Sequence, residues 1–136
     1  MTRADLESLG RRAVACAGWR WMPGMAAKGQ RGALWRIYMG SGGVLCAQGE
    51  DSDGYAAGWS NEWAEILGAL PNLSDSATLG GLLALVREKW AIPTLAPVGK
   101  EGAWMFWAGG LPDALYGLRA ATEVELLVAA LEVQNG

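Results

Sequence analysis

The sequence predicts an α+β fold: a small, mainly antiparallel sheet of 3–5 short strands with three to four helices packed on one face. Three observations predict it. Segments with helical spacing of apolar residues occur beside short alternating segments, no regular strand–helix repeat indicates a parallel sheet, and 20 glycines indicate many tight turns. A single domain covering residues 1–136 is expected, because this length is typical of one domain.

Helical periodicity marks four segments. Residues 2–17 begin with a capping-box-like threonine and aspartate. Residues 60–70 begin at the capping side chain of Ser60, and the helix to about Trp90 opens with the segment NLSDS at 72–76. A proline ends each of these two helices. The last helix begins at the capping box Thr122–Glu125. Apolar residues recur at three- and four-residue spacing in these segments, so each helix is expected to bury one face.

Three other segments alternate between two faces as strands do: residues 33–39, 44–48 and 103–108. Residues 19–22 are expected to be extended, because a proline follows them. Residues 26–32 are rich in small side chains and are predicted to form an exposed loop.

The predicted strand 103–108 is apolar on both faces. Trp104 and Phe106 share one face, and Met105 and Trp107 share the other. Such a strand is central in a sheet, or it is covered by a partner or by another subunit. For this reason a homo-oligomer is expected.

The composition excludes several classes of protein. No apolar run reaches the ~20 residues that span a bilayer, and the N-terminus has acids where a signal peptide has a basic start, so a cytoplasmic protein is expected. The chain has no histidine, which excludes Ser-His-Asp and Cys-His nucleophile systems and most zinc sites. Cys16 and Cys46 are predicted to be free thiols in a reducing compartment. No cofactor and no catalytic residue is predicted.

Two turns contain fragments of ligand-binding loops. Gly40–Gly43 lacks the Lys-Ser/Thr of a phosphate-binding loop and no helix follows it, so a hairpin turn is predicted. Asp51 and Asp53 precede Gly54 as in a calcium-binding EF-hand loop. That alignment puts a glycine and a serine at the first and twelfth ligand positions, so a turn without a metal is predicted.

Charge is distributed unevenly along the chain. Residues 1–40 carry seven cations and two acids, a net charge of +5, whereas residues 41–136 carry four cations and twelve acids, a net charge of −8. No acid occurs between Ser8 and Gly49. Two interpretations stay open: a local positive field that attracts anions, or pairing of the two halves across the fold.

The most distinctive stretch is residues 18–38, which holds three of the eight tryptophans, four cations and no acid. Aromatic rings stack on nucleotide bases, and arginine binds phosphate in bidentate geometry. We expect a ligand-binding site here, with residues 26–32 closing over a ligand. The candidate ligand-binding residues are Trp19, Arg20, Trp21, Lys28, Arg31, Trp35 and Arg36. The alternative is that these tryptophans are core residues with the arginines packed over them.

Two sequence segments are distinctive in combination: LGRRAVACAGWRWMPGM at residues 9–25 and PNLSDSATLGGLLALVREKW at residues 71–90. They resemble small accessory proteins encoded by bacteriophages and prophages, and the resemblance extends weakly over most of the chain. Those proteins have no assigned activity, so no site residue is carried over. The resemblance implies a viral accessory protein in the cytoplasm of a bacterial host, where such proteins often antagonise host defence.

The function expected from these features is non-catalytic. A phage-encoded protein would sequester a small anionic aromatic ligand, such as a nucleotide signal, and so antagonise host defence. The alternative is a protein–protein inhibitor or adaptor that acts on a host protein through an aromatic and acidic surface. An enzyme is disfavoured because Glu50, Asp51 and Asp53 have no base or metal motif beside them. Direct nucleic-acid binding is disfavoured by the net charge of −3.

Overall fold

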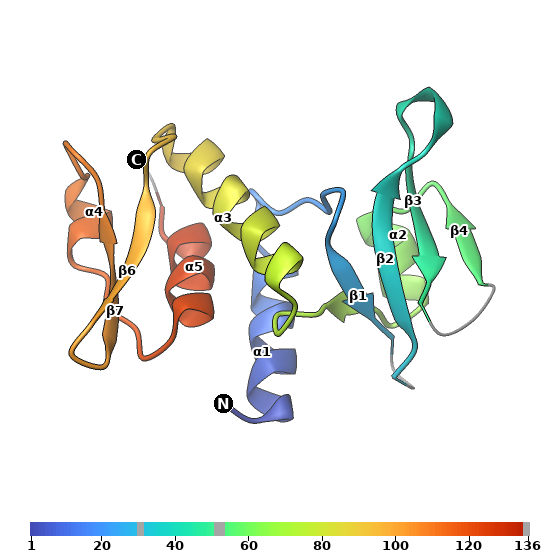
Figure 1. Cartoon of the computed structure of the whole chain (residues 1–136), viewed down its shortest axis with the longest axis horizontal. Helices are drawn as coiled ribbons and strands as arrows, with labels where there is room; N and C mark the ends of the chain where they lie inside the picture. Colours follow the sequence, from blue (N-terminus) through green and yellow to red (C-terminus); the bar gives the residue numbers. More distant parts are fainter. Residues whose placement is uncertain (30–31, 51–53, 135–136) are drawn as a thin grey trace.

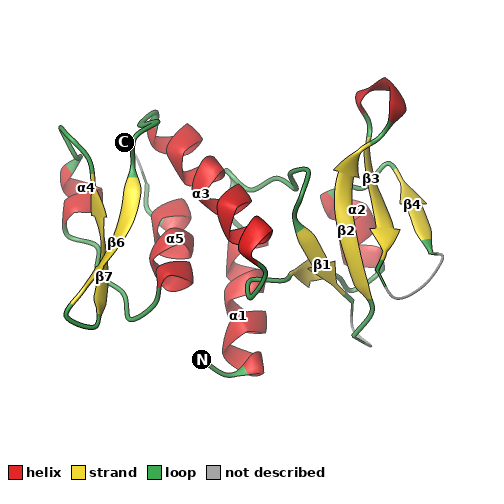
Figure 2. Ribbon diagram, viewed as in Figure 1, coloured by secondary structure: helices red, strands yellow, loops and turns green. Residues whose placement is uncertain are grey.

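The structure, a computed structural model, describes residues 1–29, 32–50 and 54–134. As predicted, the protein is α+β, with helices between a larger and a smaller antiparallel sheet (Figures 1 and 2). In chain order the described elements are α1 (Arg3–Val14), β1 (Ala26–Lys28), β2 (Leu34–Met39), the 3-10 turn η1 (Ser41–Gly43), β3 (Leu45–Gly49), β4 (Tyr55–Ala57), α2 (Asn61–Ile66), β5 (Leu70–Pro71), α3 (Ser76–Trp90), β6 (Ala96–Lys100), β7 (Ala103–Trp107), α4 (Asp113–Tyr116) and α5 (Glu123–Glu132).

The larger sheet has five strands in the order β4-β3-β2-β1-β5, and every pairing is antiparallel. Successive side chains point to opposite faces, so one face is buried and the other is more open. On the buried face Ile37 pairs with Ala47, and neither is exposed. On the open face Gln48 pairs with Tyr55, and both are exposed. The alternation predicted from the sequence therefore describes the two faces of this sheet.

Capping side chains fix where four of the helices begin, among them α2, where the hydroxyl of Ser60 accepts the N–H of Trp63. At α1 the hydroxyl of Thr2 accepts the N–H of Asp5, and the Asp5 carboxylate accepts the N–H of Thr2. Asp75 caps α3 and Thr122 caps α5, each by accepting a backbone N–H three residues later. These caps satisfy N–H groups that have no partner within their own helix.

Helix α5 joins the two halves of the molecule. It packs against α1, against α3 and against both strands of the smaller sheet (Figure 1). Helix α1 in turn lies against β5, where a Cβ added to Gly10 would be 3.5 Å from the Leu70 side chain. The absence of a side chain at Gly10 therefore allows the helix to approach the edge of the larger sheet. No helix in the described ranges has the length and apolar character needed to cross a membrane.

Strands β6 and β7 form the smaller sheet, a hairpin closed by Glu101 and Gly102, which have φ angles of 53° and 77°. A two-residue turn with positive φ at both positions matches the twist of the strands. On the inner face of β7 Phe106 is 4% exposed, whereas on the outer face Trp107 is 73% exposed. Of the two predicted settings for this strand, the central one is wrong, because β7 lies in a two-stranded sheet.

The predicted exposed loop at residues 26–32 is wrong at its first three positions, because residues 26–28 form the strand β1. Ala26 and Ala27 are buried in β1, which pairs with β2 on one side and with β5 on the other. A strand of three residues with small side chains has no recognisable period, because its pairing depends on neighbours that are distant in sequence. Helix α4, with four residues, is also too short to show a period. Strand β6 has five residues, but Pro97 and Gly99 are unfavourable in a strand and conceal it in the sequence.

Candidate functional site

Two of the three tryptophans of the predicted site belong to the core, and the third packs against it. Trp19 is 5% exposed and Trp21 is 3% exposed, while Trp35 is half-buried. Trp21 contacts Trp19 and Trp59 edge to face, with 5.5 Å between ring centroids in each pair, and Trp59 lies 6.2 Å from Trp35. The rings pack on one another, so neither Trp19 nor Trp21 offers an open face on which a base can stack.

Three indole N–H groups in this aromatic cluster have no hydrogen-bond partner in the described part of the chain: those of Trp19, Trp21 and Trp59. A buried donor without an acceptor costs about 1–3 kcal/mol. Edge-to-face packing places the positive edge of one ring near the negative face of the next, which offsets part of that cost. The aromatic cluster is therefore a structural feature, whose packing has to outweigh the cost of the three unpaired indole N–H groups.

Two predicted arginines are engaged by acids of the fold. Arg20 binds Glu88 on the surface at 2.5 Å. Arg36 donates two hydrogen bonds to Asp75, at 2.9 and 3.1 Å, and it binds Glu50 at 2.8 Å. The pKa of Arg36 is raised, chiefly by the hydrogen bond to Asp75. Both guanidinium groups therefore already have anionic partners.

The seven predicted residues do not come together as one site. The tryptophans lie in or against the core, Arg20 and Arg36 contact opposite ends of the α3 segment, and Arg31 lies outside the described residues. Lys28, at the end of β1, lines a surface pocket that was not predicted.

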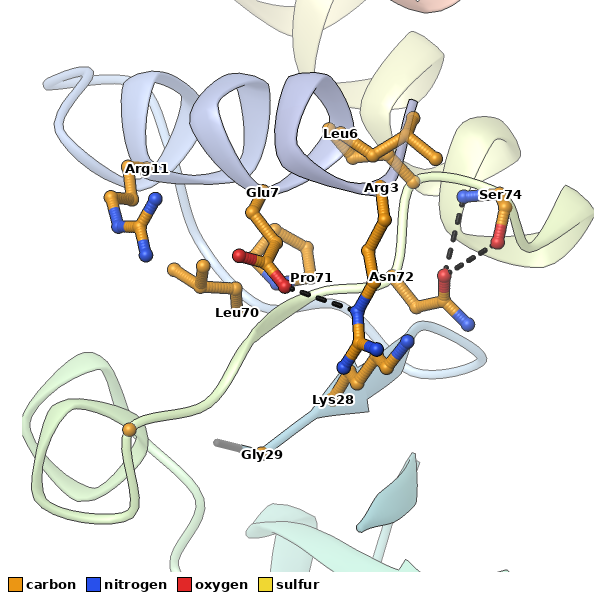
Figure 3. A pocket seen from close by; sticks show the side chains of 12 residues that line it. Arg3, Leu6, Glu7, Arg11, Lys28, Gly29, Leu70, Pro71, Asn72 and Ser74 are labelled. Carbon is orange, nitrogen blue, oxygen red and sulfur yellow. Dashed lines mark hydrogen bonds and ion pairs between the residues drawn. The ribbon is translucent and has the colours of Figure 1, made fainter. Parts of the chain in front are cut away.

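This pocket, here called the α1 pocket, has a volume of about 450 Å³ and lies beside helix α1 (Figure 3). Three parts of the chain form it: α1, the end of β1, and the segment that leads through β5 toward α3. Its charged side chains are Arg3, Glu7, Arg11 and Lys28. Leu6 and Leu70 contribute apolar surface.

The α1 pocket carries a surplus of positive charge. Arg3, Glu7 and Arg11 are spaced four residues apart, so they project from the same side of α1 (Figure 3). Glu7 pairs with Arg3 at 3.4 Å, and not with Arg11, although a Glu followed four residues later by Arg is a favourable helical pair. Lys28 lines the same space and has no acid partner among the described residues. Among the described residues, three cations and one acid therefore line the pocket.

The two interpretations of the uneven charge each apply to part of the chain. Arg12 binds Glu132, just as Arg20 and Arg36 bind acids of the second half, so these cations pair across the fold. Among the described cations, those with no hydrogen-bond or ion-pair partner are Arg11, Lys28 and Lys100. Two of these three line the α1 pocket.

Asn72 adds a polar group to the α1 pocket. Its side-chain oxygen accepts hydrogen bonds from the N–H and the hydroxyl of Ser74, at 3.3 and 2.7 Å (Figure 3). The amide nitrogen of Asn72 makes no hydrogen bond to any described residue and is a free donor. Cationic groups, a neutral donor and apolar surface together can hold an anion that also has an uncharged portion.

The described ranges hold no cluster of side chains suited to binding a metal ion. No three His, Cys, Asp or Glu side chains of those ranges lie close enough to hold a metal ion. Asp51 and Asp53, considered above for calcium, lie outside them. Cys16 and Cys46 are free thiols, as predicted, and burial raises the pKa of Cys16.

Sequence reasoning missed Arg3 and Arg11. Each lies four residues from Glu7 in a predicted helix, so Arg3, Glu7 and Arg11 share one face of that helix. This spacing could have indicated a charged helix face. The second wall of the pocket had no signal, since Lys28 and Asn72 meet α1 only through the pairing of β1 with β5. No protein-family model matches the chain, and no significant match occurs among curated proteins or solved structures. Any assignment of function therefore rests on the geometry described above.

Proposed function

We propose that this protein is a non-catalytic binding protein that holds a small anionic ligand in the α1 pocket. One observation carries the proposal: most cations of the described chain are engaged within the fold, but Arg11 and Lys28 have no partner and line the same pocket. The pocket's volume of about 450 Å³ lies in the range of small-molecule sites, roughly 300–1,000 Å³.

The physical argument is electrostatic. An anion between Arg3, Arg11 and Lys28 gains charge-assisted hydrogen bonds, which are about twice as strong as neutral ones. Glu7 cancels part of this positive field through its pair with Arg3. The remaining positive charge matches a ligand with one or two negative charges. The resemblance to phage accessory proteins suggests a role for such binding: sequestration of an anionic signal of host defence in the cytoplasm of an infected bacterium.

Calorimetry with a panel of mono-, di- and cyclic nucleotides and sugar phosphates tests the proposal. Arg11→Gln and Lys28→Gln should each weaken binding of the best ligand roughly tenfold, because each removes a charged hydrogen-bond donor. Lys100→Gln is the matched control, since Lys100 is also an unpartnered cation but lies in the distant β6–β7 hairpin. Failure of every anion to bind, or an equal loss in the Lys100 variant, would refute the proposal.

A second candidate function, an inhibitor or adaptor of a host protein, is favoured by a different surface. Trp107 and Tyr116 are 73% and 68% exposed, and with Arg119 they line a hollow of about 420 Å³. Trp, Tyr and Arg are the side chains that dominate binding energy at protein interfaces. Light scattering of the wild type and of Trp107→Ser measures whether this surface joins two copies of the chain. Enrichment from host lysate with the same two proteins tests whether it binds a different protein. If the wild type and the Trp107→Ser variant are both monomeric and neither enriches a partner from host lysate, the inhibitor or adaptor function is excluded.

A further inference from the structure

We infer that the α1 pocket is one half of a two-compartment groove that takes a nucleoside monophosphate, with the phosphate at the cations and the base in the second compartment. This inference rests on the proposed function, because it identifies the chemical class of the proposed anionic ligand. It is carried by a second pocket that shares three lining residues with the first and by the different chemistry of the two.

The two compartments are adjacent, because they share lining residues. The second has a volume of about 300 Å³, and it shares Arg11, Gly68 and Leu70 with the α1 pocket. Both therefore lie along the same side of α1, and Arg11 stands at their junction. A ligand that filled both would pass beside the Arg11 guanidinium, which has no partner among the described side chains.

The second compartment differs from the first in charge. Its lining includes Trp21, Asn61 and Glu65 but, apart from the shared Arg11, no cation. Glu65 is exposed, and its carboxylate binds no cation or hydrogen-bond donor in the described ranges. A carboxylate accepts hydrogen bonds from N–H donors, and an asparagine amide both donates and accepts them. These groups suit the edge of a base that carries amino and ring N–H groups.

Apolar surface completes the second compartment. Val14 and the edge of the aromatic cluster at Trp21 line it, beside Ala64 and Ala69. The faces of a flat heterocycle can pack on such apolar surface at little cost in free energy, because the N–H groups at its edge remain hydrogen-bonded. A phosphate is disfavoured there, because Glu65 would repel it.

The opposite signs of the two compartments orient the ligand. Arg3 and Lys28 attract an anionic end to the first compartment, and Glu65 favours a hydrogen-donating end in the second. A nucleoside monophosphate has these two ends joined by a sugar. Guanosine monophosphate is the best-matched probe, since the guanine edge presents adjacent ring and amino N–H donors to a carboxylate.

Calorimetry with guanosine monophosphate, guanosine and ribose 5-phosphate tests the inference. Guanosine monophosphate should bind at least tenfold more tightly than either fragment, because only the whole molecule reaches both compartments. Glu65→Gln should weaken guanosine monophosphate roughly tenfold but leave ribose 5-phosphate unchanged. Glu62→Gln is the matched control on the same helix, since Glu62 lies outside the lining of both compartments.

The outcomes separate this inference from the proposed function. Equal affinities for ribose 5-phosphate and guanosine monophosphate, with sensitivity to Lys28→Gln, would overturn the two-compartment inference and leave anion binding intact. Equal effects of Glu65→Gln and Glu62→Gln would also overturn it. Failure of both phosphorylated probes to bind would overturn the inference, and failure of the whole anion panel would overturn the proposed function as well.

Discussion

Arg36 of β2 binds Asp75, the N-cap of α3, through two parallel hydrogen bonds of 2.9 and 3.1 Å. Asp75 also accepts hydrogen bonds from the N–H and the hydroxyl of Thr78, and the Thr78 hydroxyl accepts the N–H of Ala26 in β1. Two strands of the larger sheet are thus joined to the start of α3. Arg36, a predicted ligand-binding residue, connects the sheet to a helix.

Replacing Asp75 should destabilise the protein more than breaking an exposed ion pair. Asp75→Asn keeps a good capping side chain but removes the charge that Arg36 binds, so we expect the free energy of unfolding to fall by about 1.5–3 kcal/mol. Urea denaturation measures this change. The control is Arg20→Gln, whose pair with Glu88 is more than half exposed and should contribute about 0–1 kcal/mol. Similar losses in the two variants would contradict this assignment.

Stability should fall on acidification through two carboxylates. The pKa of Asp75 is lowered from 3.8, chiefly by the hydrogen bond from Arg36, and the pKa of Glu132 is lowered from 4.5, chiefly by Arg12. Because the folded state favours the ionised forms, the two carboxylates contribute fully to the free energy of unfolding above their ordinary pKa values. This contribution is lost as the pH falls below those pKa values. Urea denaturation between about pH 6 and pH 3 should show the decline. The Asp75→Asn/Glu132→Gln variant should show a flatter profile, and parallel profiles would rule out these two groups as its source.

Two adjacent glycines in α3 should respond oppositely to alanine. A Cβ at Gly80 meets nothing within 4 Å, so Gly80→Ala should stabilise the protein by about 0.5–1 kcal/mol through helix propensity. A Cβ at Gly81 would lie 2.7 Å from Cε and 3.2 Å from Cγ of Met25, which is fully buried. Overpacking of this kind costs typically about 1–3 kcal/mol, so Gly81→Ala should be destabilising. Thermal unfolding of both variants checks the sign, and equal shifts would contradict the packing of Met25 on α3.

Tyr55 should ionise at unusually high pH. Its hydroxyl donates to the sulfur of Cys46 at 3.5 Å, and this hydrogen bond, with a further one involving Tyr38, raises the pKa of Tyr55 to about 12. Cys46→Ala should therefore lower this pKa toward 10.0 in an absorbance titration of the tyrosines. Tyr116→Phe should leave the high-pH transition in place. Loss of that transition in the Tyr116 variant would show that the wrong tyrosine had been identified.

Local chemistry made most regular elements predictable. The capping residues Thr2, Asp75 and Thr122 mark helix starts because their side chains satisfy N–H groups a few residues away. The alternation in residues 33–39 marks β2 because a pleated strand turns successive side chains to opposite faces. These signals lie within one turn of helix or one strand, so they are complete in the sequence itself.

The site depended on contacts between distant segments. The sequence by itself determined the α+β class, the helix caps, the free thiols and the uneven charge. Only the tertiary structure decided which cations are engaged: Arg36 binds Asp75, whereas Arg11 and Lys28 line one pocket and have no partner among the described residues. It also decided that Trp19 and Trp21 are core residues, since ring packing depends on Trp59, which is far away in the chain. The physical reason is that burial and ion pairing depend on three-dimensional neighbours, which local spacing does not specify.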